Sequence, residues 1–137
     1  MKKGVSLLLL IFMAALFMIL AFLLTKVVYN SYASVKAAET REAAFWQAEA
    51  GLEKGKAALA GNTNWYTDLP HTPEDDANWL INSAIGEIGQ LGRGSYKIVR
   101  EENQQHLYSI GRKGKGVVVL KLSFSSPPLK FGTWEEL

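Results

Sequence analysis

The 137-residue chain has no cysteine, and no proline precedes Pro70. Without cysteine, no disulfide can stabilise a domain and no thiolate can hold zinc. The two histidines, His71 and His106, stand too far apart in the sequence to suggest a metal pair, and no nucleophile motif such as G-x-S-x-G is present. We therefore expect no enzyme activity, no catalytic residue and no cofactor.

Strong charge of one sign is also absent, since the formal net charge is only +2. This balance does not suggest a nucleic-acid or anionic-surface protein. Glu74, Asp75, Asp76 and Asn78 offer oxygen atoms that Ca²⁺ accepts, but they lack the alternating spacing and central glycine of an EF-type loop. We interpret these acids as the start of a helix, and we expect no metal site.

An uncharged run from Leu7 to Leu24 follows the short basic start of the chain. It contains 18 residues with no charge, Pro, Gly, Asn or Gln, which is about enough to cross a bilayer as a helix. It is longer than the usual apolar core of a cleaved export signal, and no small-x-small cleavage site follows it directly. We expect residues 5–25 to be a transmembrane helix segment, and the lysines before it favour a cytoplasmic N-terminus.

Helix formers continue beyond this run to about Ala60, and the pattern becomes amphipathic. Apolar residues recur at steps of three, four or seven, and a stripe is expected to pack under a sheet through Val35, Phe45, Leu52 and Leu59. Gly51 and Gly55 mark either a close approach of sheet and helix, or a bend, or merely tolerated small residues, and we favour the last interpretation. Gly61-Asn62 is a typical helix end. Residues 26–60 are thus the amphipathic continuation of the helix.

The remaining residues, 61–137, are expected to form a small α+β domain. Thr72 as N-cap and Pro73 in the first turn predict a second helix that ends near Gly89. Alternating residues then predict three antiparallel strands over 96–100, 106–110 and 117–124. Gly111–Gly116 is predicted to be a glycine-rich turn with a basic tip. The tail Leu129–Leu137 is expected to be docked on the domain.

The start Lys2-Lys3-Gly4-Val5-Ser6-Leu7 resembles the class III signal of type IV prepilins and pseudopilins. In that family a membrane peptidase cuts after the glycine and N-methylates the new first residue. The resemblance implies that residues 1–4 are a prepilin leader and that Gly4 and Val5 form the processing site. It also implies a pilin-like fold, in which the long helix is first transmembrane and then amphipathic, and packs on a small antiparallel sheet.

Leu9 departs from the pattern of most major pilins, which carry Glu as the fifth mature residue. In that family the Glu neutralises a neighbour's N-terminal amine. PilX-type minor pilins and the tip pseudopilin of type II secretion systems often lack it, and this chain resembles them. The run FWQAEAGLE from Phe45 to Glu53 also resembles a run of that subset.

The resemblance implies a minor pilin or pseudopilin, a structural subunit for assembly or priming of a type IV pilus or a type II secretion filament. Its partners would be other pilins or pseudopilins, the prepilin peptidase, an inner-membrane assembly platform and the lipid bilayer. It would lie in the bacterial inner membrane before assembly into a pilus or periplasmic pseudopilus.

Two alternatives stay open at this point. The first is a single-pass envelope protein whose small domain binds a partner. The second is a DNA-uptake pilin, which only the basic residues Arg112, Lys113 and Lys115 support. We expect no nucleic acid among its partners.

Overall fold

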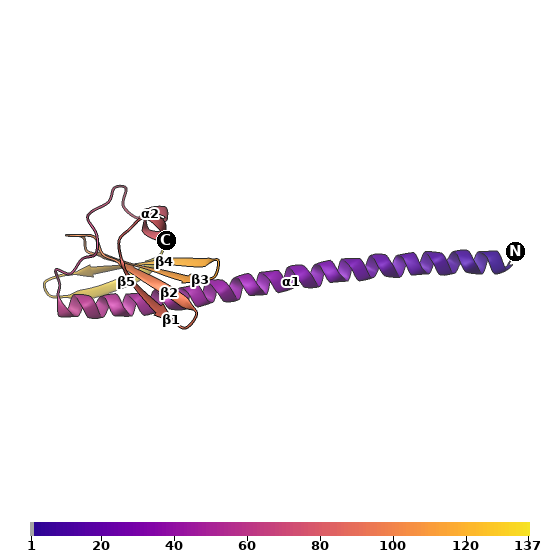
Figure 1. The fold of residues 1–137 in the computed structure, drawn as a ribbon, viewed down its shortest axis with the longest axis horizontal. Helices are drawn as coiled ribbons and strands as arrows, with labels where there is room; N and C mark the ends of the chain where they lie inside the picture. The colour runs from indigo at the N-terminus through magenta and orange to yellow at the C-terminus, as the bar shows by residue number, and fades with distance from the viewer. Residues whose placement is uncertain (1) are drawn as a thin grey trace. The chain divides into compact units, whose positions relative to one another are not determined.

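The computed structural model describes residues 2–137, so Met1 of the expected leader lies outside the described residues. Residues 2–137 form the expected α+β fold, with a long N-terminal helix packed against an antiparallel sheet, and this sheet has five strands (Figure 1). The helices are α1 (Lys2–Gly61) and α2 (Ala77–Asn82). The strands pair in chain order and are β1 (Glu87–Leu91), β2 (Gly94–Val99), β3 (His106–Lys113), β4 (Gly116–Ser125) and β5 (Lys130–Glu136).

The chain divides into two compact units, Met1–Ala37 and Ala38–Leu137. In the first unit, the described residues all belong to helix α1. The second unit contains the rest of α1, from Ala38 to Gly61, together with helix α2 and the sheet. All buried residues among the described part of the chain belong to this second unit, so it holds the hydrophobic core.

Helix α1 is continuous because its sequence lacks proline and is rich in Ala, Leu, Lys and Glu. It ends as the sequence predicts. The Asn62 amide donates to the carbonyl oxygen of Ala58 at 2.9 Å, and the Asn62 side-chain oxygen accepts from the Asn64 amide at 3.0 Å. An Asn side chain that bonds the backbone two residues on turns the chain away from the helix.

The last turns of α1 cover one face of the sheet (Figure 1). Alternate residues of the strands point to this face, as expected for pleated strands. Leu52 and Leu59 of α1 pack there with apolar residues of the three central strands. The strand residues of this cluster are Tyr96, Ile98, Leu107, Val118, Leu120, Leu122 and Phe124.

Small residues of α1 face strand β3, and this corrects our interpretation of Gly51 and Gly55. A Cβ atom at Gly51 would lie 2.2 Å from the Ser109 hydroxyl oxygen, and one at Gly55 would lie 2.5 Å from a methyl carbon of Leu107. Neither space admits a side chain without rearrangement. The glycines therefore allow a close approach of sheet and helix.

Helix α2 covers the opposite face of the sheet (Figure 1). Leu80 of α2 is buried there together with the other set of alternating strand residues. These are Val99, Tyr108, Ile110 and Val119, joined by Ala84. The sheet is thus covered on both faces, although α2 is short.

The second helix is shorter than the sequence predicts, and Thr72 is not its N-cap. Asp76 is the cap, since its carboxylate accepts from the Trp79 amide at 3.1 Å. The helix ends at Asn82, and the stretch that was expected to continue it forms strand β1, in which Ile88 pairs with Lys97 of β2. Pairing with strand β2 therefore overrides the longer helix that the local sequence predicts.

The sheet has two strands more than predicted. The three expected strands are present as β2, β3 and β4, in longer form. The tail forms β5 at one edge, and β1 forms the other edge. The glycine-rich turn contains fewer residues than predicted, because Gly111 and Gly116 lie within strands. Of these three glycines, only Gly114, with φ of 55°, needs a left-handed conformation.

Candidate functional site

The apolar run at the start of α1 is the first candidate site. Its side chains are exposed on all sides of the helix, and among residues 2–137 this is the one helix long and apolar enough to cross a membrane. By its length and composition, α1 is a candidate membrane span. Exposure of such an apolar surface to water is unfavourable, whereas the hydrocarbon core of a bilayer, about 30 Å thick, is a suitable environment for it.

The three positions singled out near the N-terminus all lie within α1. Gly4 has open space around it, since a Cβ atom there would meet nothing within 4 Å. Val5 is 69% exposed and Leu9 is 60% exposed. These exposed positions are accessible to another molecule.

The expected stripe under the sheet is only partly correct. Leu52 and Leu59 are buried, and Phe45 packs partly buried against the core and lies 5.5 Å, centroid to centroid, from the ring of Trp134. Val35 is 58% exposed, so its assignment to the stripe is wrong. Ala44 is the first buried residue of α1, more than two turns after Val35, and helical spacing alone cannot show where a sheet begins to cover a helix.

The run Phe45–Glu53 is divided between the core and the surface. Gln47 and Ala48 face the sheet, and the Gln47 amide group donates to the carbonyl oxygen of Leu91 at 2.7 Å. Trp46 is 56% exposed and stands edge-on to Phe45 at a centroid distance of 5.8 Å. The run thus joins the helix to the end of β1, and it also leaves an aromatic side chain on the surface.

A polar cluster on the α2 side of the sheet centres on Asp75. Tyr108 donates to one carboxylate oxygen at 2.8 Å, and Lys121 donates to the other at 2.9 Å. The hydrogen bond from Lys121, followed by that from Tyr108, lowers the pKa of Asp75 although burial opposes the shift. The same contact raises the pKa of Lys121. Burial, with the hydrogen bond to Asp75, raises the pKa of Tyr108.

This cluster binds the loop before α2 to strands β3 and β4, and it leaves no open cavity for a substrate. The sequence indicated the acids but not their partners. Tyr108 and Lys121 were assigned to strands without a role. The two residues lie directly opposite each other on neighbouring strands, on the same face of the sheet. The pairing of these strands, had it been known, would have placed them side by side.

His71 lies at the edge of this cluster. Its ring stacks on Trp79 at a centroid distance of 4.0 Å, and its Nε2 atom is 3.5 Å from a carboxylate oxygen of Asp76. Within residues 2–137, no group of three or more His, Cys, Asp or Glu side chains is arranged to hold a metal ion. The cluster is therefore a set of stacking and ion-pair contacts around the start of α2.

Two buried charged residues, Arg100 and Glu101, hold the loop that follows α1. The Arg100 guanidinium donates to the carbonyl oxygens of Thr63, Trp65 and Gln104. The carboxylate of Glu101 accepts from the His71 amide at 2.6 Å. The sequence does not indicate this role, because charged residues are seldom buried and these two are buried only where partners distant in the chain meet them.

Arg112, the first of the basic residues near the β3–β4 turn, is bonded within the chain. Arg112 donates to the carbonyl oxygen of Ile81, and Lys97 donates to those of Ile81 and Ala84, so both are bonded to the C-terminal end of α2. Positive groups at a helix C-terminus satisfy its unpaired carbonyls. A shallow cavity of about 360 Å³ lies nearby, with Arg93 and Arg112 in its wall.

Comparisons of this chain with protein-family models, curated proteins and solved structures found no match.

Proposed function

We propose that the chain is a minor pilin or pseudopilin, a structural subunit that assembles or primes a type IV pilus or a type II secretion filament. Its action is assembly and not catalysis. The observation that supports this most is helix α1, which is one element of 60 residues with an exposed apolar start and a buried end. A domain the size of residues 38–137 does not need such a helix for its own core.

The two parts of α1 suit two successive environments. In the inner membrane, residues 5–25 lie in lipid, with the N-terminus in the cytoplasm and the domain on the other side. In the filament, the same residues pack against those of neighbouring subunits. Lipid tails are as apolar as leucine, so this exchange is driven by close packing and by the assembly machinery and not by the hydrophobic effect.

Leu9 determines the position we propose within the filament. After a cut behind Gly4, Leu9 is the fifth residue and supplies no carboxylate for the N-terminal amine of a neighbour. A subunit without this ion pair is less suited to the repeated contacts of a shaft. The proposal is therefore that the chain works at the tip or as a primer, with other pilins or pseudopilins below it.

The DNA-uptake alternative has less support from the contacts. It relied on Arg112, Lys113 and Lys115, and the Arg112 guanidinium is bonded to Ile81 of the same chain. A phosphate would have to compete with this contact.

The N-terminus of the mature chain tests the proposal. The full chain is produced in a host with a prepilin peptidase, and intact-mass spectrometry should find a terminus at Val5 that carries one methyl group. Gly4→Arg should abolish the cut and still insert in the membrane, because the apolar run is unchanged. Lys3→Arg, which keeps both the glycine and the charge, is the matched control and should be cut. An uncut Met1 terminus would leave only the single-pass envelope protein.

A further inference from the structure

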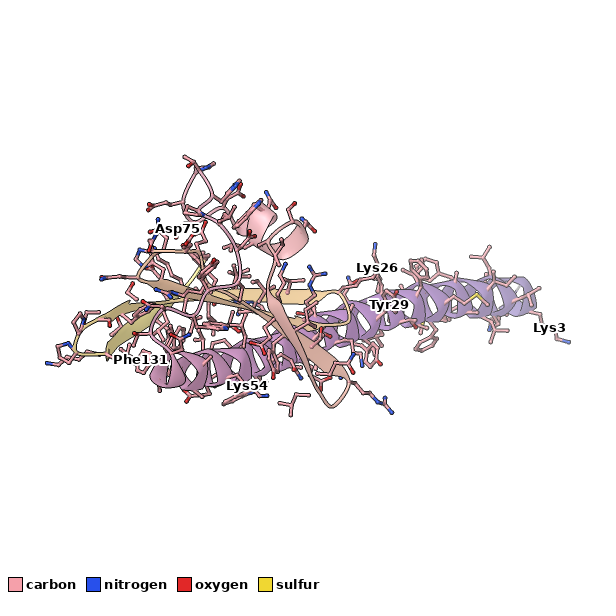
Figure 2. All side chains as sticks on the ribbon, turned by 60° about the vertical axis from the view of Figure 1, so that its left-hand side comes forward. Lys3, Lys26, Tyr29, Lys54, Asp75 and Phe131 are labelled. Carbon is pink, nitrogen blue, oxygen red and sulfur yellow. The ribbon has the colours of Figure 1, made fainter. Side chains whose placement is uncertain are left out.

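Apolar surface continues past the end of the span. Beyond Lys26, helix α1 exposes Val27, Val28, Tyr29 and Tyr32 by 62%, 66%, 70% and 67%. Figure 2 shows Lys26 and Tyr29 projecting from the same part of the helix, with no other element of the first unit to cover them. We name residues 26–32 the interface segment.

The spacing of the lysines matches a bilayer. Lys3 and Lys26 are separated by roughly 35 Å along the helix, at a rise of about 1.5 Å per residue. The hydrocarbon core is about 30 Å thick. Both ammonium groups therefore reach the headgroups when the helix stands nearly upright, and the interface segment begins where the hydrocarbon ends.

The tyrosines lie at the depth that aromatic residues prefer. Tyr29 follows Lys26 by about 4.5 Å and Tyr32 by about 9 Å along the axis, and each headgroup layer is roughly 5–8 Å thick. Side chains of a helix tilt toward its N-terminus, which here means toward the bilayer. Their rings therefore lie closer to the lipid than their Cα atoms do, with Tyr29 inside the headgroup layer and Tyr32 at its outer limit.

We propose that the interface segment binds lipid headgroups and sets the depth of α1 in the membrane. Lys26 contacts lipid phosphate, and the rings of Tyr29 and Tyr32 lie between the acyl chains and water, where amphipathic aromatics are stabilised. Lipid is the occupant because the segment is continuous with the span and because it joins a cation to amphipathic rings. The proposal rests on the span of the proposed function and goes beyond it, since a span needs no tyrosine at its end.

The absence of cysteine allows a direct test, because each introduced cysteine is unique. The full, uncut chain carries one nitroxide label at a time at Ala15, Ser31 or Val35, in vesicles of phosphatidylcholine and phosphatidylglycerol. Collision rates with oxygen and with a water-soluble nickel chelate report the depth of each label. We expect the label at Ala15 to be deepest, the label at Ser31 to lie among the headgroups, and the label at Val35 to be in water.

Variants of the two tyrosines then test their role. Tyr29→Ser with Tyr32→Ser should raise the nickel accessibility at Ser31 to the level of Val35 and shift the label at Ala15 by about 5 Å, one helical turn. Tyr29→Trp with Tyr32→Trp is the matched control and should keep the original depths, since Trp is also an interfacial residue. Circular dichroism should show unchanged helix in both variants.

Each outcome decides a separate claim. If the serine variant keeps the depths of the original chain, the tyrosines do not anchor the helix and the inference is wrong. If Ser31 is shielded only at high protein-to-lipid ratio, another copy of the chain covers the segment, and the inference is again wrong. If the label at Ala15 is itself open to nickel, the span is wrong and the proposed function fails with it.

Discussion

A Cβ atom at Gly111 would lie 1.9 Å from the carbonyl oxygen of Ala44, so strand β3 and helix α1 meet backbone against backbone. One turn further along the helix, the Ser109 hydroxyl donates to the carbonyl oxygen of Ala48 at 2.6 Å. This buried hydrogen bond needs the same close approach. The join between helix and sheet is therefore made by small residues and one polar contact, with larger apolar residues on either side.

Gly111→Ala should therefore be strongly destabilising. The added methyl group meets backbone that cannot move without displacing the helix. Overpacking typically costs about 1–3 kcal/mol, and a clash with backbone belongs at the upper end of that range. Urea unfolding of the fragment 26–137, which lacks the whole apolar run, measures the change. Gly61→Ala is the control, because nothing lies within 4 Å of that position, and it should change the free energy of unfolding by less than about 0.5 kcal/mol. Equal effects of the two substitutions would contradict the close approach.

The same fragment should be soluble and monomeric, since its truncation removes the exposed apolar run and residues 2–25 contribute no buried residue to the core. In it, Leu59→Ala should cost about 2–5 kcal/mol, because Leu59 is fully buried and its loss leaves a cavity. Val35→Ala should cost less than about 0.5 kcal/mol, as expected for an exposed side chain. Sedimentation equilibrium and urea unfolding check the two claims. A large effect of Val35→Ala would mean that the sheet covers more of the helix.

The Asp75 carboxylate should make folding stability depend on pH. Its pKa is lowered in the folded state from 3.8, first by the hydrogen bond from Lys121. Its contribution is therefore complete above about pH 4–5 and is lost as the pH falls through the lower folded-state pKa. Asp75→Asn should remove about 1 kcal/mol near neutral pH, a typical value for a half-exposed ion pair, and the difference from the original chain should vanish in acid. Asn tolerates the positive φ of 57° found at this residue, so the backbone is matched.

Lys121 should give the opposite dependence at high pH. Its pKa is raised by Asp75, so its contribution is complete below about pH 10.5 and is lost as the pH rises through the folded-state pKa. Unfolding curves of the fragment across the pH range, with and without Asp75→Asn, show both limbs. A constant difference between the two proteins from pH 7 to pH 2 would contradict the ion pair.

Leu9 should restrict the chain to few copies in each filament. Leu9→Glu is expected to be neutral or harmful, because an unpaired carboxylate in lipid or in a packed core is costly. Loss of the protein should reduce the number of filaments and leave the length of the survivors similar. Quantitative immunolabelling of the original chain measures the copy number. Labelling at shaft density would rule out a tip or priming position.

The sequence alone determined the local features of this protein. The continuous helix to Gly61, its stop at Asn62 and the strands β2, β3 and β4 follow from proline placement, helix propensity and alternation. These signals act over a few residues, so neighbouring residues are enough to produce them. The membrane-length run and the position of Gly4 are also visible without a structure.

Only the tertiary structure decided which surfaces meet. It converted the end of the predicted second helix to strand β1, made Gly51 and Gly55 contact positions, and left Val35 outside the covered part of α1. It also brought Asp75 to Tyr108 and Lys121. Each outcome depends on residues far away in the chain, because a strand pair or a buried face is stable only when its partner is in place, and no local pattern contains that partner.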